Sequence, residues 1–185
     1  MNPHRRTLTR GVAGLGALAA CGSAGLWPAV GLAQPASAAA EEAKAPPMPA
    51  VGSVWKVPAL DRFNAPRFEP SQAEGKMLLI YWWASTCPFC ALQSPAMEAF
   101  WRAHQSRGLQ MLGISIDRKY EDAVAYLQKK AYTFPSGWAT PAFKQAMPKP
   151  RGLPITLLRG RDGRLLLAEK GQMFAEDVEA MVQWL

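Results

Sequence analysis

The chain has 185 residues, of which 49% are hydrophobic and 19% charged. This length and composition fit one globular domain with a short appendage and exclude a large multidomain enzyme. The formal net charge of +7 admits nucleic-acid or membrane-surface binding, so the positions of the charges decide between these classes. Three cysteines are too few for a small domain held together by disulfides, and their odd number leaves at least one outside an intramolecular pair.

Residues 1–40 have the pattern of an export signal. Three arginines among the first ten residues form a basic start, and residues 11–20 contain no polar side chain. A run of small residues, 36–40, then precedes two glutamates that open a Pro-rich stretch. We expect this segment to direct the protein to the periplasm and not to belong to the fold.

Two features of this signal leave its processing open. Residues 4–10 resemble a twin-arginine signal, and a general secretory signal with two adjacent arginines fits as well. Leu18-Ala19-Ala20-Cys21 resembles a bacterial lipobox, in which the cysteine is lipidated and anchors the protein to a membrane. The small and apolar residues that continue past Cys21 favour cleavage further downstream. Cys21 is therefore either a lipidation site or part of a discarded segment.

Removal of the signal weakens the case that the net charge makes for nucleic-acid or membrane-surface binding. The mature chain would carry a net charge of +4, with its basic residues spread along the sequence. The one cluster, Arg159, Arg161 and Arg164, surrounds an Asp-Gly turn, where exposed charges are expected. No basic patch with interleaved aromatics remains, so we expect no nucleic-acid partner. No later apolar run has the length of a membrane span.

The mature chain begins with a linker and an irregular segment. Residues 41–53 contain three prolines and Gly52 and predict an extended linker without a core of its own. Residues 54–70 alternate weakly in polarity and contain three more prolines, so they predict short edge strands or a β-hairpin around Trp55 and Phe63. We therefore place the folded domain at residues 54–185.

A strand, a helix and a second strand come next. Residues 77–83 are a continuous apolar run, typical of a central strand buried on both faces, and residues 110–116 are another. Between them, residues 88–104 contain no glycine and have apolar residues at helical spacing. This order predicts a right-handed parallel crossover.

The second half predicts an antiparallel arrangement. Residues 120–130 predict a helix, and residues 132–152, rich in proline and aromatics, an irregular insertion with a short helix near Phe143. An Asp162-Gly163 turn joins two apolar runs into a β-hairpin, and the residues from Ala175 predict a closing helix. The whole predicts an α/β fold with a mixed central sheet flanked by helices, an N-terminal β-hairpin extension and a central insertion.

Cys87-Pro88-Phe89-Cys90 lies where the first buried strand gives way to the first helix. The start of a helix turns both cysteines to one side, and Pro88 suits its first turn because no N–H is needed there. The unpaired N–H groups and the helix dipole favour a thiolate. Cys87 is therefore the candidate nucleophile that attacks a disulfide of a partner protein, and Cys90 is the candidate that resolves the mixed disulfide.

Two other uses of C-x-x-C compete with this redox interpretation. A closed zinc site needs four ligands, but after export no third cysteine remains and His104 is the last histidine. A purely structural disulfide that closes so small a loop would add little stability for its strain. We therefore expect no metal and no cofactor besides the redox-active Cys87–Cys90 pair.

The sequence from Val51 to Leu185 resembles the exported thioredoxin-fold thiol–disulfide oxidoreductases of the TlpA/ResA type. Residues 83–90, W-A-S-T-C-P-F-C, are similar to the family's W-A-x-x-C-x-x-C, and Pro95 takes the place of its helix-kinking proline. The resemblance implies a thioredoxin-like fold and a monomeric enzyme that reduces disulfides of periplasmic proteins, with electrons from an upstream thiol–disulfide donor. A disulfide oxidase or isomerase of secreted proteins is the alternative.

The resemblance also assigns site residues beyond the cysteines. Residues 152–156, G-L-P-I-T, resemble the family's cis-proline loop, which implies a cis Pro154 beside the dithiol and a Leu153 backbone free to pair with an extended substrate. Taken alone, Pro154 would be an ordinary proline at the start of a strand. The flanking residues that would support the site or shape its docking surface are Trp83, Pro88 and Phe89.

Two positions depart from the family. Thr86 stands before the first cysteine, where this fold commonly has tryptophan, which changes the apolar surface beside the nucleophile. Tyr81 stands six residues before the first cysteine, where thioredoxin has a buried aspartate. A tyrosine does not accept a proton near neutral pH, so water or another acid must take the Cys90 proton. Glu98 and Asp117 are candidates, but we expect a solvated helix residue and a helix cap, respectively.

Two other functions require residues that this chain lacks. A peroxiredoxin needs P-x-x-x-[TS]-x-x-C, but Ile80 and Ala84 occupy its proline and hydroxyl positions. A metal-binding chaperone for copper needs a longer cysteine spacing and a downstream histidine. We therefore predict a thiol–disulfide oxidoreductase. Its direction is set by the resemblance alone, because Pro88-Phe89 adds no charge to the active-site turn.

Overall fold

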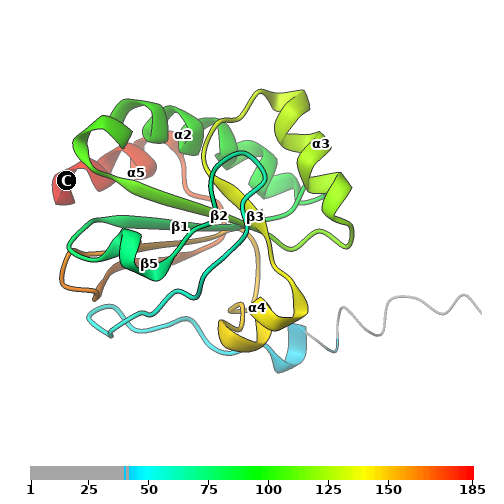
Figure 1. Ribbon diagram of the computed structural model, residues 1–185, viewed down its shortest axis with the longest axis horizontal. Helices are drawn as coiled ribbons and strands as arrows, with labels where there is room; N and C mark the ends of the chain where they lie inside the picture. Colours follow the sequence, from blue (N-terminus) through cyan, green and yellow to red (C-terminus); the bar gives the residue numbers. More distant parts are fainter. Residues whose placement is uncertain (1–39, 41) are drawn as a thin grey trace, which may run out of the picture. The chain divides into compact units, whose positions relative to one another are not determined.

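A mixed five-stranded sheet forms the centre of the domain (Figure 1). The computed structural model describes residues 40 and 42–185, so the predicted export signal, Cys21 included, lies outside the described residues except for Ala40. The strand order is β3-β2-β1-β4-β5; β1, β2 and β3 run parallel, whereas β4 is antiparallel to both β1 and β5. The strands are β1 (Leu78–Trp83), β2 (Gln110–Ser115), β3 (Ser136–Trp138), β4 (Ile155–Arg159) and β5 (Leu165–Lys170). The predicted mixed sheet is confirmed.

The helices begin and end where local signals place them. They are α2 (Pro88–His104), α3 (Tyr120–Lys130), α4 (Pro141–Ala146) and α5 (Ala175–Ala180), with 3-10 turns η1 (Pro70–Ala73), η2 (Gln105–Arg107) and η3 (Met181–Trp184). The first turn of α3 carries two acidic residues and its last turn two lysines, which complement the helix dipole. The predicted helices 88–104 and 120–130 are confirmed with the same bounds.

Strand β1 lies in the middle of the sheet, and all six of its residues are buried. Because side chains alternate along a strand, Leu79, Tyr81 and Trp83 face one apolar cluster and the residues between them face another. The first cluster also contains Cys90 and buried residues of α2, α3 and α5. Figure 1 shows these three helices together on one side of the sheet.

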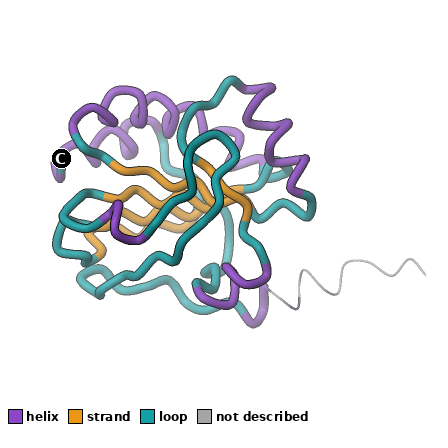
Figure 2. Tube along the Cα trace, in the orientation of Figure 1, coloured by secondary structure: helices purple, strands orange, loops and turns teal. Residues whose placement is uncertain are grey.

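The other face of the sheet is covered mainly by irregular chain (Figure 2). Its cluster draws on α4 and on residues 57–73, where Leu60 and Phe68 form a single β-bridge. The prediction of short edge strands or a β-hairpin for residues 54–70 is confirmed only as isolated bridges, since Leu60 pairs with Phe68, Val54 with Arg164 and Arg62 with Gly137, and these residues form no regular strand. Proline removes the N–H donors that a regular ladder needs, which accounts for the difference.

Residues 42–53, predicted to be a linker, contact the domain. Gly52 N–H donates to the Leu165 carbonyl oxygen (2.8 Å), and Leu165 N–H donates to the Ser53 carbonyl oxygen (3.0 Å). The Arg151 guanidinium donates to the carbonyl oxygens of Glu42 and Ala43 at 3.0 Å each. These bonds hold the described part of the segment against the domain.

The insertion at residues 132–152 contributes a strand that the composition does not predict. The short helix near Phe143 is confirmed as α4, but β3 also forms within the insertion and adds a parallel strand beside β2. Gly137 allows the close approach of the chain there, because a Cβ atom at this position would lie 2.2 Å from the Asp61 carbonyl oxygen. A strand of three residues is too short to show a periodic pattern.

The C-terminal part follows the prediction. The Asp162-Gly163 turn joins β4 to β5, with Gly163 at a φ of +83° that only glycine adopts readily. The closing helix is confirmed as α5, and it tightens into the 3-10 turn η3. Within the described residues, no helix has the length and apolar character needed to span a membrane.

Candidate active site

The two cysteines lie at the N-terminus of α2, and a disulfide joins them with their Cα atoms 5.2 Å apart. Cys87 is the N-cap residue and is half-buried, whereas the side chain of Cys90 is 1% exposed. Cys90 N–H points at Cys87 Sγ, at 3.1 Å. An N–H donor at the helix start stabilises negative charge on that sulfur once the bond is reduced. Cys87 is thus the sulfur that a partner can reach.

A buried carboxylate anchors the loop that leads to Cys87. Asp117 accepts hydrogen bonds from Ser85 N–H (3.0 Å), from the Ser85 hydroxyl (2.6 Å) and from the Ser115 hydroxyl (2.7 Å). The Asp117 side chain follows β2 and Ser85 follows β1, so the bonds tie the ends of two adjacent parallel strands together. They position the backbone two residues before Cys87.

The prediction that Asp117 caps a helix is therefore wrong. Lys119 is the residue before α3, and Asp117 is 5% exposed with its oxygens turned toward the two serines. The backbone carbonyl oxygen of Asp117 also accepts a bond from the Trp138 indole at 2.7 Å. The sequence signal for this role is an acid directly after a buried parallel strand, at the sheet edge where the cysteine loop begins.

Neutral side chains lie beneath Cys90. The Tyr81 hydroxyl donates to the Cys90 carbonyl oxygen (3.2 Å) and lies 3.1 Å from Ser94 Oγ. The Ser94 hydroxyl donates to the same carbonyl oxygen at 2.7 Å. Both side chains are fully buried. At the position where thioredoxin has an aspartate, this chain therefore has a phenol that bonds to the backbone of Cys90. The hydrogen bonds among Tyr81, Ser94 and Cys90 involve no carboxylate.

The Tyr81 phenol does not accept the Cys90 proton. Burial, with smaller contributions from Tyr126 and Tyr132, raises the pKa of Tyr81 above its ordinary value of 10.0, although the Ser94 bond opposes the shift. The group therefore stays protonated and neutral at neutral pH. This agrees with the inference that water or an ionised acidic side chain must take the Cys90 proton.

Glu98 is not available for that task. Its carboxylate accepts bonds from Thr133 N–H (2.8 Å), Phe134 N–H (2.9 Å) and the Arg102 guanidinium (2.5 Å). Burial raises the pKa of Glu98, but these bonds and one from the Thr133 hydroxyl outweigh it and lower the pKa below its ordinary value. The prediction of a solvated residue is wrong, because Glu98 fastens α2 to the start of the insertion.

The proline loop lies next to the end of β1. The Leu153–Pro154 peptide bond is cis. In the antiparallel register of β1 and β4, Trp82 pairs with Ile155, which places Pro154 opposite Trp83, four residues before Cys87. Gly171 N–H donates to the Pro154 carbonyl oxygen at 2.9 Å, whereas no backbone hydrogen bond of Leu153 occurs among residues 42–185.

The flanking residues divide into buried supports and an exposed surface. Trp83 is fully buried and packs against Tyr126, with ring centroids 5.5 Å apart, so it supports the site and does not meet a partner. Thr86 and Pro88 are exposed, and Phe89 is 56% exposed. Phe89 therefore presents an apolar surface beside Cys87.

Gln93 is a supporting residue that the sequence did not reveal. Its side-chain amide donates to the Thr156 hydroxyl and accepts from Met173 N–H, both at 2.9 Å. These buried bonds join α2 to β4, two residues after Pro154, and to the chain before α5. A glutamine within a helical pattern gives no local sign of burial, so only the tertiary structure identifies it.

The described residues contain no group of three or more His, Cys, Asp or Glu side chains that could hold a metal ion. The two sulfurs of Cys87 and Cys90 can carry out thiol–disulfide exchange. The half-buried sulfur can attack, and the buried sulfur can displace what was bound.

Comparison with known proteins agrees with this geometry. Residues 56–140 match the sequence profile of the AhpC/TSA family. None of the curated proteins matches the chain.

Solved structures share the fold of the domain. A thioredoxin domain of a thiol-disulfide oxidoreductase from Bacteroides vulgatus is 19% identical with a TM-score of 0.62, covering 73% of this chain and 96% of its own. A thiol:disulfide interchange protein from Chlorobium tepidum is 20% identical with a TM-score of 0.62, at 72% and 97% coverage. A secreted Mycobacterium tuberculosis disulfide oxidoreductase, homologous to E. coli DsbE, is 16% identical with a TM-score of 0.60, at 69% and 95% coverage. These structures show that the fold is thioredoxin-like.

Proposed function

We propose that this protein is an exported thiol–disulfide oxidoreductase of the TlpA/ResA type, which reduces disulfides of periplasmic proteins through Cys87 and Cys90. One observation carries the proposal: the half-buried sulfur of Cys87 and the buried sulfur of Cys90 share one helix N-terminus. The position of the Leu153–Pro154 loop, opposite the end of β1, supports it.

The reaction transfers two electrons from the dithiol to the disulfide of the client protein. The Cys87 thiolate attacks one client sulfur, the client S–S bond breaks, and the departing client thiolate takes up a proton. The Cys90 thiol then loses its proton to water and attacks Cys87 Sγ, which releases the second client thiolate. The client leaves as a dithiol, and the protein holds the Cys87–Cys90 disulfide.

Client docking involves the surfaces on either side of Cys87. The Leu153 backbone, without a hydrogen-bond partner among residues 42–185, supplies one N–H and one carbonyl for an extended client segment. Phe89 supplies the apolar contact. We place the client across these two elements.

Reduction is favoured over oxidation by the resemblance in sequence. The dithiol would be regenerated by an upstream thiol–disulfide donor, and the domain would act as a monomer without another cofactor. A disulfide oxidase or isomerase of secreted proteins is the alternative, because the neutral Pro88-Phe89 pair sets no extreme potential. The residues at the peroxiredoxin positions argue against a peroxiredoxin. Ile80, which stands at the position of the peroxiredoxin proline, is a strand residue and packs in the opposite apolar cluster from Cys90.

Export is proposed from residues 1–40, and the secreted Mycobacterium relative supports it. Mass spectrometry of the mature N-terminus distinguishes a diacylated Cys21, which would anchor the protein to a membrane, from a cut near Ala40.

The redox potential tests the proposed direction. The mature domain is equilibrated in glutathione and dithiothreitol buffers, and its thiols are trapped and counted. We expect one two-electron transition well below the strongly oxidising range at about −120 mV, together with catalysis of insulin disulfide reduction. A potential in that range would overturn the reductant assignment in favour of the oxidase.

A further inference from the structure

A groove with an excess of basic side chains borders both active-site loops. Its volume is about 680 Å³, and it lies between residues 42–46, the loop after β2, and α4 with the residues that follow it. Its charged lining residues are Glu42, Lys44, Asp117, Arg118, Lys144 and Lys149. Four of the six are cationic.

Three of the four cations in the groove are exposed, whereas neither of its two carboxylates is. The Asp117 carboxylate is 5% exposed and is occupied by hydrogen bonds from Ser85 and Ser115. Lys44, Arg118 and Lys144 are exposed. Glu42 is then the one carboxylate of the lining that meets the cations from the solvent side.

The structure shows how a carboxylate is held there. Lys149, whose side chain is 14% exposed, donates through Nζ to the carbonyl oxygens of Pro150 (2.7 Å) and Gly152 (2.9 Å). Glu42 Oε2 lies 3.5 Å from the same nitrogen, and Glu42 Oε1 accepts the Gly152 N–H. A buried ammonium with two donors fixed on carbonyls thus directs its remaining donor at an anion.

This carboxylate position adjoins residues 152–154, which we name the docking loop because the Leu153 backbone is proposed to pair with the client. Gly152 immediately precedes Leu153 and the cis Pro154, and Arg151 N–H bonds to the Pro46 carbonyl oxygen at 3.4 Å. At the other wall of the groove, the Asp117 carboxylate accepts a hydrogen bond from Ser85 N–H, two residues before Cys87. A polypeptide that crosses the docking loop on its way to Cys87 therefore meets the basic groove.

We propose that this groove binds an acidic segment of the client protein next to its disulfide, and that Glu42 marks the position of one client carboxylate. The inference rests on the proposed function, since the client is the protein whose disulfide is reduced. The chain's own residues 42–46 occupy the position and give way to the client when it binds.

The test uses three cyclic peptides of equal length, each closed by one disulfide. Their cysteines are flanked by glutamates, glutamines or lysines, and single-turnover rate constants are measured with the reduced mature domain. The glutamate peptide should react about tenfold faster than the glutamine peptide at about 20 mM salt, and the difference should shrink at about 500 mM salt. The lysine peptide should be the slowest.

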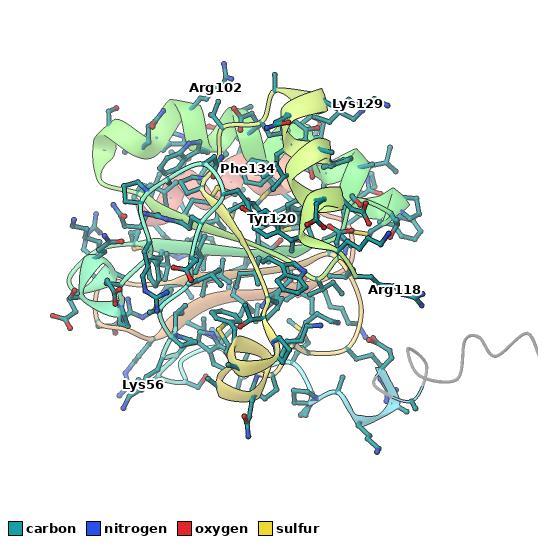
Figure 3. All side chains as sticks on the ribbon, turned by 45° about the vertical axis from the view of Figure 1, so that its right-hand side comes forward. Lys56, Arg102, Arg118, Tyr120, Lys129 and Phe134 are labelled. Atoms are coloured by element: carbon teal, nitrogen blue, oxygen red, sulfur yellow. A yellow bond between two sulfur atoms is a disulfide. The ribbon has the colours of Figure 1, made fainter. Side chains whose placement is uncertain are left out.

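Charge reversal with a matched control locates the effect. Figure 3 shows Arg118 before α3 and Lys129 at the far end of that helix, with Lys56 at a third place on the surface. The variant R118E/K144E should lose the preference for the glutamate peptide, and K56E/K129E, with the same change in net charge, should keep it. Glu42→Gln should raise the glutamate-peptide rate about threefold by freeing the Lys149 position.

Three outcomes would contradict the inference. Equal rates for the three peptides exclude a charge-selective groove, as does a preference that survives in R118E/K144E. A glutamate peptide that reacts no faster with Glu42→Gln excludes the assignment of the Glu42 position. If the wild-type domain fails to reduce even the glutamine peptide, the proposed function itself is contradicted.

Discussion

The surroundings of the two active-site cysteines differ in polarity. Cys87 is half-buried at the end of a loop that a carboxylate, Asp117, holds through Ser85. Cys90 is buried above Tyr81 and Ser94, which are neutral and direct their hydroxyl groups at its backbone. The charged group thus acts on the position of the Cys87 sulfur, whereas the side chains bonded to the Cys90 backbone within residues 42–185 are neutral.

In the proposed reaction, this difference separates the two steps. Attack by Cys87 depends on a loop geometry that buried hydrogen bonds maintain. Resolution by Cys90 depends on a proton leaving a neutral, apolar environment, which disfavours the thiolate. The following predictions test this division.

Replacement of the cysteines should have the largest effect. Cys87→Ser should lower insulin disulfide reduction by at least about 1000-fold, because the nucleophile is lost. Cys90→Ser should also stop turnover but should accumulate a mixed disulfide through Cys87, visible by mass spectrometry after acid quenching. If both variants kept turnover, the redox interpretation would be wrong.

Removal of the carboxylate on the Cys87 side should have the next largest effect. Asp117→Ala leaves the donors of Ser85 and Ser115 without their acceptor and should cost about 3 kcal/mol of unfolding free energy. The rate at which Cys87 attacks small-molecule disulfides should also fall in this variant. Asp122→Ala, at an exposed position in the first turn of α3, is the control and should cost less than about 1 kcal/mol. Similar losses in both variants would contradict the anchoring role.

Glu98 should affect stability and not resolution, because its carboxylate is bonded to the insertion and not to Cys90. Glu98→Gln should lower the unfolding free energy at pH 7 by about 2 kcal/mol in urea titrations. The folded-state pKa of Glu98 is lowered, so this contribution is fully present above the ordinary value of 4.5 and is lost as the pH falls through the folded-state pKa.

Glu169→Gln, at an exposed position in β5, is the matched control and should leave the unfolding free energy at pH 7 nearly unchanged. A resolving step that slows more than about tenfold in Glu98→Gln would show instead that Glu98 takes the Cys90 proton.

Loss of the Tyr81 hydroxyl should have the smallest effect. Tyr81→Phe should cost about 1 kcal/mol, because one buried hydrogen bond to the Cys90 carbonyl is lost while Ser94 keeps the other. The decay rate of the mixed disulfide should change by less than about twofold, since the phenol stays neutral. A much slower decay that depends on pH would identify Tyr81 as a proton acceptor.

The helices and central strands could be predicted because their signals are local. The apolar runs of β1 and β2, the helical spacing of α2 and the Asp162-Gly163 turn each depend on neighbouring residues. In contrast, β3 forms because residues 136–138 reach the edge of β2, where a distant partner supplies the hydrogen bonds. The role of Glu98 could not be predicted for the same reason, since its hydrogen-bond partners lie 35 and 36 residues away along the chain.

By itself, the sequence determined that a C-x-x-C pair stands between a buried strand and a helix, and hence which two sulfurs are the candidates for redox chemistry. Only the tertiary structure decided what surrounds them. It sets Asp117 beside the Cys87 loop, Gln93 between α2 and β4, and residues 42–46 along the docking loop. The physical reason is that spacing along the chain encodes local geometry, whereas the partner of a buried polar group is chosen by the packing of distant segments.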